Sequence, residues 1–147
     1  MLAILHARAE DIPRIREIAE ASFPDPWSEA GFLSELKADG VFYAAFNEGR
    51  LDGYLVLRSM GDTCEVLDVA VAPEARRTGI GEAMLATAVQ YAREHGAEKV
   101  WLEVRAGNAP ALGLYEKYGF LRVGLRKNYY AGPPEDAVLM ERKLKET

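Results

Sequence analysis

The chain has 147 residues, of which 49% are apolar, 28% are charged and 10% are aromatic. This composition excludes a disordered or fibrous chain and predicts one globular domain over residues 1–147. The chain is long enough to bury a core without disulfides or metal ions to stabilise it. The net charge of -5 argues against sequence-independent nucleic-acid binding and suits a basic partner.

Cysteine usage and apolar runs indicate the compartment. Cys64 is the single cysteine, which excludes an internal disulfide and a Cys-rich zinc site and suits a reducing environment. The N-terminal apolar run breaks at His6 and Arg8, too early for a signal-peptide core, and no run is long enough to cross a bilayer. We expect a cytoplasmic protein without a membrane segment, and, since neither His6 nor His95 lies in a ligand pattern, without a metal site.

The first part of the chain predicts a strand and two helices. A strand over residues 2–7 leads to Asp11, a good N-cap for a helix with one apolar stripe. That stripe consists of Ile12, Ile15, Ile18 and Ala19. A proline-rich loop then ends at Ser28, a second N-cap, where Trp27 and Phe32 are spaced for a hydrophobic staple over a short helix.

The middle of the chain predicts three strands followed by a helix. The strands cover residues 41–46, 53–59 and 64–71, and the stretch "NEGRLD" between the first two is typical of an antiparallel hairpin. The helix covers residues 80–95, and Gly96 supplies a left-handed C-cap.

The last part continues the alternation. Residues 99–105 predict a strand, and Asn108 caps a helix through about Tyr118 that Gly119 ends. Two further strands are predicted at residues 120–126 and 136–144, joined by a loop at residues 127–135. The order of elements is that of a mixed α/β fold.

A basic, glycine-broken turn reads "RRTGIG" at residues 76–81 and opens a helix directly after an apolar strand. It lacks the Lys-Ser/Thr of a P-loop and the third glycine of the dinucleotide fingerprint. Glycines let the backbone approach a ligand, while unpaired N–H groups at a helix start favour an anion. Together with Arg76 and Arg77 the turn suits a pyrophosphate, and a tight turn with solvated arginines is the alternative.

With these motifs in order, the sequence resembles the GNAT superfamily of N-acetyltransferases, whose pattern Arg/Gln-x-x-Gly-x-Gly holds the pyrophosphate of coenzyme A. Within it, the bacterial RimI branch of ribosomal-protein alanine N-acetyltransferases is similar to "WLEVRAGNAPALGLYEKYGF", "RKNYY" and "EDAVLM", and its substrate-side loop to "FPDPWSEAGF". The resemblance covers nearly the whole chain. It implies acetyl-CoA as co-substrate and the GNAT fold, a mixed, largely antiparallel central sheet with splayed central strands, flanked by helices.

The resemblance also implies roles for individual residues. Backbone groups of Val69, Ala70 and Val71 would bind the acyl and pantetheine part. The pyrophosphate would lie against Arg76, Arg77, Thr78, Gly79, Ile80, Gly81 and Glu82. Asn108 would contact the cofactor from the next helix. The turn departs from the branch at its first arginine, where glutamine is frequent, and at its glutamate, where a basic residue is common.

An acceptor for the amine's proton is required, because an α-amino group with a reference pKa of about 8 is mostly protonated near neutrality. Glu103 interrupts an otherwise apolar strand, and apolar surroundings disfavour the charged carboxylate, which makes it a stronger base, directly or through water. The resemblance implies the same role. The alternative is a structural ion pair with Arg105, which lies two residues on and so on the same face.

A proton donor is required for the departing thiolate, and the hydroxyl of Tyr115 fits that role and matches the family's acid. The alternative is core packing, since Ala111, Leu114 and Tyr118 share its helical stripe. A backbone N–H on the strand ending "DVAV" would stabilise the oxyanion if that strand splays. Cys64 has no histidine nearby in the chain, so we expect direct transfer rather than an acyl-enzyme.

Aromatic side chains are candidates for the substrate walls. Trp27, Tyr129 and Tyr130 would admit a peptide N-terminus, with ordinary surface packing as the alternative. By resemblance the substrate is the alanine terminus of a small ribosomal protein. Broader protein N-termini, lysine side chains and small amines are alternatives, as is a non-catalytic acyl-CoA-binding subunit, which would need neither Glu103 nor Tyr115.

Overall fold

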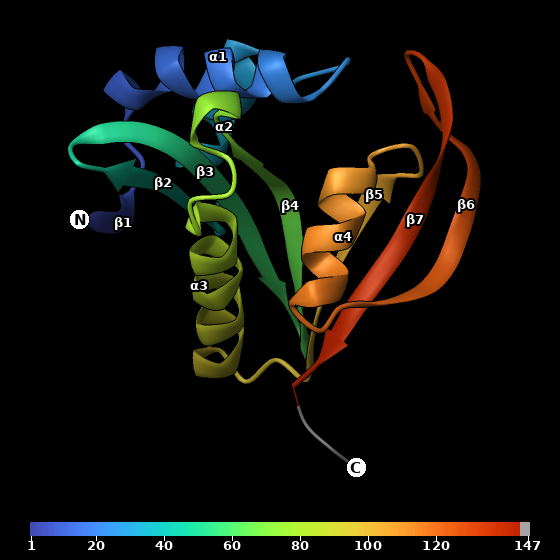
Figure 1. Ribbon diagram of the computed structural model, residues 1–147. Coiled ribbons are helices and arrows are strands. Elements are labelled where there is room, and N and C mark those ends of the chain that lie inside the picture. The colour runs from blue at the N-terminus through green and yellow to red at the C-terminus, as the bar shows by residue number, and fades with distance from the viewer. Residues whose placement is uncertain (145–147) are drawn as a thin grey trace. The chain divides into compact units, whose positions relative to one another are not determined.

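A computed structural model describes residues 1–144 (Figure 1). Contacts divide these residues into two compact units. Unit 1 comprises residues 1–58 and 67–84, and unit 2 comprises residues 59–66 and the chain from Leu85 onward. The single domain over residues 1–147 stays a prediction.

Within residues 1–144, seven strands form one sheet in the hydrogen-bonded order β1-β2-β3-β4-β5-β7-β6. The strands are β1 (Leu2–His6), β2 (Val41–Asn47), β3 (Arg50–Met60), β4 (Thr63–Val71), β5 (Lys99–Arg105), β6 (Leu121–Ala131) and β7 (Pro134–Lys143). β4 and β5 pair in parallel, whereas β1 with β2, β2 with β3, β5 with β7 and β6 with β7 pair antiparallel. The predicted mixed, largely antiparallel sheet is confirmed, and the splay of its central strands stays a prediction.

The helices are α1 (Ile12–Ser22), α2 (Glu29–Leu36), α3 (Ile80–Glu94) and α4 (Ala109–Lys117), with 3-10 turns η1 (Ala9–Asp11) and η2 (Pro73–Ala75). All members of the predicted α1 stripe are buried. Asp11 is the N-cap residue of α1 as predicted, although its side chain makes no capping hydrogen bond to that helix. Its carboxylate instead accepts a hydrogen bond from the Arg8 N–H at 2.9 Å, because η1 turns it back along the chain. No helix within residues 1–144 is long and apolar enough to cross a bilayer.

α2 begins as the sequence predicts. The Ser28 hydroxyl oxygen accepts a hydrogen bond from the Gly31 N–H at 3.1 Å, and the ring centroids of Trp27 and Phe32 lie 5.4 Å apart, which confirms the staple. Phe32 is fully buried and meets Tyr54 edge-on at 5.5 Å in the core of unit 1.

Glycine positions confirm the predicted turns and helix ends. The β2–β3 hairpin turns at Glu48 and Gly49, whose φ angles of 52° and 80° are typical of a two-residue hairpin turn. Gly96 and Gly119 follow α3 and α4 with φ angles of 74° and 92°, as left-handed C-caps do.

The predicted loop at residues 127–135 was wrong, because β6 and β7 continue through most of it. Asn128 has a φ of 53°, and its N–H donates to the Asp136 carboxylate at 2.8 Å. The register shifts between Arg126 and Tyr130, which absorbs the extra residues and lets the ladder resume. Both tyrosines of "RKNYY" therefore belong to a strand.

Candidate active site

The turn between β4 and α3, in unit 1, leaves backbone donors unused. Within residues 1–144 the N–H groups of residues 77–81 donate to no acceptor, and the Ala83 N–H is the first to bond back, to the Gly79 carbonyl at 3.0 Å. Arg77 and Gly79 have φ angles of 65° and 89°, and such left-handed residues gather successive N–H groups into an anion-binding concavity. A Cβ added to Gly79 would meet no atom within 4 Å. The backbone at Gly79 therefore borders open space, and the unused donors of the turn suit the pyrophosphate of acetyl-CoA.

Side chains of the turn stabilise its conformation and give it a positive charge. The Thr78 hydroxyl donates to the Ala75 carbonyl, and Ile80 is buried, so the turn is fastened at both of these points. Arg76 and Arg77 are exposed next to the α3 N-terminus, where their charges add to the helix dipole. Glu82 is exposed in the first turn of α3.

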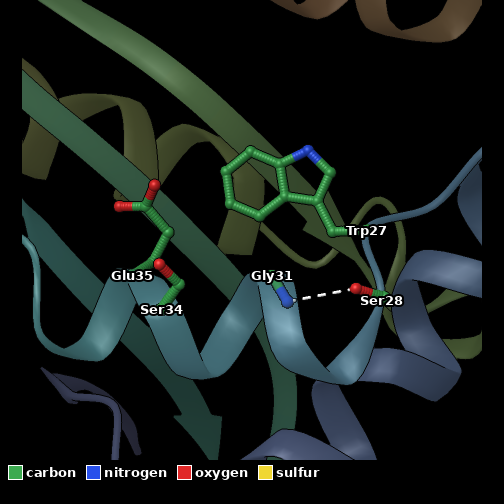
Figure 2. Close-up of a pocket in the computed structure, with 5 residues that line it drawn as sticks. All are labelled: Trp27, Ser28, Gly31, Ser34 and Glu35. Atoms are coloured by element: carbon green, nitrogen blue, oxygen red, sulfur yellow. Dashed lines mark hydrogen bonds between the residues drawn. The ribbon is translucent and has the colours of Figure 1, made fainter.

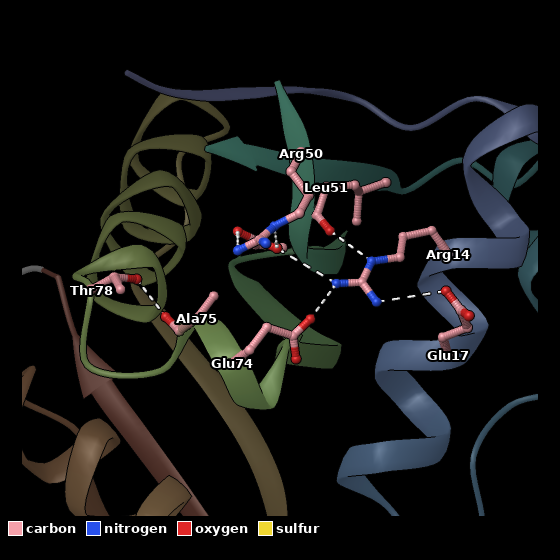
Figure 3. Close-up of polar contacts among 8 residues, drawn as sticks. Arg14, Glu17, Arg50, Leu51, Glu74, Ala75 and Thr78 are labelled. Carbon is pink, nitrogen blue, oxygen red and sulfur yellow. Dashed lines mark hydrogen bonds and ion pairs between the residues drawn. The ribbon is translucent and has the colours of Figure 1, made fainter. Parts of the chain in front are cut away.

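An ion network around the buried Asp52 holds η2, which leads into this turn (Figure 3). Arg14 contacts Glu74 of η2 at 2.7 Å and donates to the Leu51 carbonyl at 2.9 Å. Arg14 also lies 3.5 Å from Asp52, a fully buried carboxylate that Arg50 binds at 2.9 Å. The hydrogen bond from Arg14 lowers the pKa of Glu74 and raises the pKa of Arg14. Sequence reasoning missed this network because its members come from three separate segments.

β4 carries the segment Val69–Val71 expected to meet the acyl group, and Ala70 is buried there. Directly before it, the Asp68 carboxylate accepts a hydrogen bond from the Tyr54 hydroxyl at 2.9 Å. Burial raises the pKa of Asp68 to about 7, against the lowering effect of hydrogen bonds from Tyr54 and the following backbone, while the charge of Asp25 raises it further. An acidic residue in an apolar strand was the available signal for Asp68, as it was for Glu103.

Glu103 lies on β5 in unit 2 with 13% of its side chain exposed. Its Oε2 lies 2.8 Å from the Arg126 Nε, an ion pair, and accepts no hydrogen bond from residues 1–144. Arg105 binds Glu135 at 3.0 Å and the Pro133 carbonyl at 2.9 Å. An ion pair at Glu103 therefore exists through Arg126, a partner that sequence reasoning missed because it placed that residue at the edge of a loop.

α4 carries the other two candidates of unit 2. The Tyr115 ring is buried and lies 6.0 Å from the Phe120 ring, so the packing expected of it is present. Asn108 caps α4 as predicted, with its Oδ1 accepting from the Ala111 N–H at 3.3 Å. The cap leaves the amide nitrogen of Asn108 for another partner. Acid catalysis by Tyr115 and cofactor binding by Asn108 stay predictions.

The candidate substrate residues lie in both units. Trp27 borders a pocket of about 380 Å³ in unit 1 (Figure 2), lined by Trp27, Ser28, Gly31, Ser34 and Glu35. In unit 2, Tyr129 is 49% exposed and meets Tyr130 edge-on at 5.1 Å. The charge of Glu103 raises the pKa of Tyr129. The Arg105 guanidinium lies 4.3 Å from the centre of the Tyr130 ring.

Cys64 is fully buried, and burial raises the pKa of its thiol to about 11. A thiol in that state is a poor nucleophile near neutrality, which favours direct transfer over an acyl-enzyme. Residues 1–144 contain no group of three or more His, Cys, Asp or Glu side chains that could hold a metal ion.

The chain matches known proteins over nearly its whole length. The model of the acetyltransferase (GNAT) family matches residues 12–120. A ribosomal protein bS18-alanine N-acetyltransferase of Escherichia coli is 31% identical, covering 95% of this chain and 96% of the relative. An N-alpha-acetyltransferase of Sulfurisphaera tokodaii is 34% identical, covering 96% and 92%. The crystal structure of the ribosomal-protein-S18-alanine N-acetyltransferase from E. coli matches with a TM-score of 0.88 at 30% identity, covering 100% of this chain and 96% of that one.

The chain therefore belongs to the GNAT acetyltransferase family. It is an N-acetyltransferase that uses acetyl-CoA, and the predicted family, fold and enzyme class are confirmed.

Proposed function

We propose that this enzyme acetylates the α-amine of a protein N-terminus, the alanine terminus of a ribosomal protein. The names of the E. coli and S. tokodaii relatives support this choice. The net charge of -5 suits a basic ribosomal partner through long-range attraction. The single cysteine suits a reducing compartment, and we place the reaction in the cytoplasm.

The observation that carries the proposal is the row of unused N–H donors at residues 77–81. These donors, with Arg76 and Arg77, would hold the pyrophosphate, while the backbone of Val69–Val71 and the Asn108 amide would hold other parts of the cofactor. When bound, acetyl-CoA supplies an acetyl group activated as a thioester. The turn contributes binding and orientation, which raise the effective concentration of the reacting groups.

The acid–base chemistry falls to two side chains of unit 2. Glu103 takes a proton from the substrate ammonium, since its carboxylate is mostly shielded from water and the cation that contacts it, Arg126, is more than half exposed. Tyr115 gives a proton to the leaving sulfur. The candidates for peptide contacts are Trp27 in unit 1 and, in unit 2, Tyr129 and Tyr130.

The test is thiol release from acetyl-CoA with mass detection of the product. Peptides beginning with Ala, Ser, Gly or Met are compared with an N-blocked lysine peptide, and Glu103→Gln serves as the control for enzymatic transfer. We expect the fastest transfer to the α-amine of the Ala peptide. Equal transfer to several termini, or transfer to lysine, would contradict the narrow substrate. Tight cofactor binding without turnover on any substrate, including the folded ribosomal protein, would favour a non-catalytic subunit.

A further inference from the structure

Arg126 reaches Glu103 by crossing a neighbouring strand. On β7, Ala137 pairs with Arg126 and Leu139 pairs with Glu103. These two β7 residues are two positions apart, so the charged residues on either side of β7 lie on the same face of the sheet. The Arg126 Nε lies 2.8 Å from the Glu103 Oε2. The bulge that starts directly after Arg126 ends the regular ladder at this point.

Other charged and titratable groups face Glu103 from each neighbouring strand of unit 2. They are Glu65 on β4, Arg105 on β5, Tyr129 on β6 and Glu141 on β7. Arg105 is engaged by Glu135 at 3.0 Å, and Glu141 is engaged by Lys99 at 3.0 Å. The pKa of Tyr129 is raised, so its hydroxyl remains neutral throughout the neutral range. Arg126 is thus the cation that directly contacts Glu103, within residues 1–144.

The two partners of the Arg126–Glu103 ion pair differ in their exposure to solvent. The Arg126 side chain is 54% exposed, whereas that of Glu103 is only 13% exposed. Water therefore competes with Glu103 for the exposed guanidinium, and the long Arg126 side chain must be ordered to hold the contact. While it contacts Glu103, the guanidinium already lies beside the Tyr129 ring, with its Cζ 5.7 Å from the ring centre, so this cation–π contact can persist when the ion pair breaks.

We propose that Arg126 is a positioning residue that the substrate displaces. Before the peptide binds, the Arg126 guanidinium occupies the Glu103 Oε2. When the α-ammonium arrives, it replaces the guanidinium, which keeps its contact with the Tyr129 ring. This inference rests on the proposed function of Glu103 as the base. An N–H proton then passes to the carboxylate oxygen, and the nitrogen keeps the electron pair that attacks the acetyl carbon.

Two measurable consequences follow from removing the charge in Arg126→Gln. Loss of a nearby cation disfavours the charged form of a mostly shielded carboxylate, so the acid limb of kcat/KM should move to higher pH. At pH values above the acid limb, the Arg126 guanidinium no longer competes with the substrate ammonium for the Glu103 carboxylate. The KM for the peptide should therefore fall several-fold while kcat changes little.

Arg122→Gln is the matched control. Arg122 lies on the same strand, is also 54% exposed and pairs with Glu116 at 3.0 Å, away from Glu103. It loses the same unit of charge and should keep the wild-type pH profile and KM. Arg126→Lys retains a cation and should restore most of the acid limb.

The experiment measures initial rates with an Ala-terminal peptide from about pH 5.5 to pH 9 for wild type and all three variants. In parallel, carboxyl NMR titration of the same ¹³C-glutamate-labelled proteins follows Glu103, whose signal is assigned by its loss in Glu103→Gln. We expect the Glu103 signal to titrate at higher pH in Arg126→Gln alone. An unchanged midpoint, an unchanged KM, or equal shifts in Arg122→Gln would overturn the inference. Absence of peptide turnover in wild type would instead refute the proposed function. The NMR titration would still test the contact between Arg126 and Glu103.

Discussion

Asp68→Asn should remove a pH dependence of stability that is built into β4. The pKa of Asp68 rises on folding from its ordinary value of 3.8 to about 7, chiefly because of burial. Between these values the folded chain holds a proton that the unfolded chain has released, so the free energy of unfolding falls as pH rises through this window. Each unit of pKa difference corresponds to about 1.4 kcal/mol, and the fall from about pH 5 to pH 8 is about 2 to 3 kcal/mol.

The assay is urea unfolding of wild type and Asp68→Asn at about pH 5 and pH 8. Asparagine keeps an acceptor for the Tyr54 hydroxyl but cannot ionise, so its advantage over wild type should grow by about 2 to 3 kcal/mol between the two conditions. Asp62→Asn, at an exposed turn, is the control and should follow wild type. Parallel pH dependence in wild type and Asp68→Asn would refute the reasoning, because it would show that Asp68 titrates alike in the folded and unfolded chains.

Three further substitutions test the proposed chemistry. Glu103→Gln should lower kcat about a hundredfold with unchanged acetyl-CoA affinity, measured by steady-state kinetics and calorimetry; full turnover would remove Glu103 as base. Tyr115→Phe should slow the chemical step and leave the unfolding midpoint close to wild type, and a normal single-turnover rate would exclude it as acid. Gly79→Val should weaken acetyl-CoA binding at least tenfold, whereas Gly49→Val, with the same kind of positive φ and equally open space, should not; equal losses would assign the effect to backbone strain.

Local signals in the sequence were sufficient for most elements. The α1 stripe, the Ser28 cap and the helix end at Gly96 depend on residues within a few positions of one another, and the structure confirms each. Such patterns work because helix periodicity, capping and left-handed turns are properties of short segments. The turn at residues 76–81 was found in the same way, from its glycines and its place before a helix.

The tertiary structure decided which charged groups meet. The ion pair of Glu103 with Arg126, the hydrogen bond of Asp68 with Tyr54 and the network around Asp52 join residues that lie apart in the chain. The predicted loop failed for the same reason, because the bulge at residue 128 is held by a carboxylate of the opposite strand. The sequence by itself determined most of the segments, the family and the place of the glycine turn at residues 76–81. Strand register and packing determined the partners of its buried charges, because a contact between distant residues exists only once the sheet has aligned them.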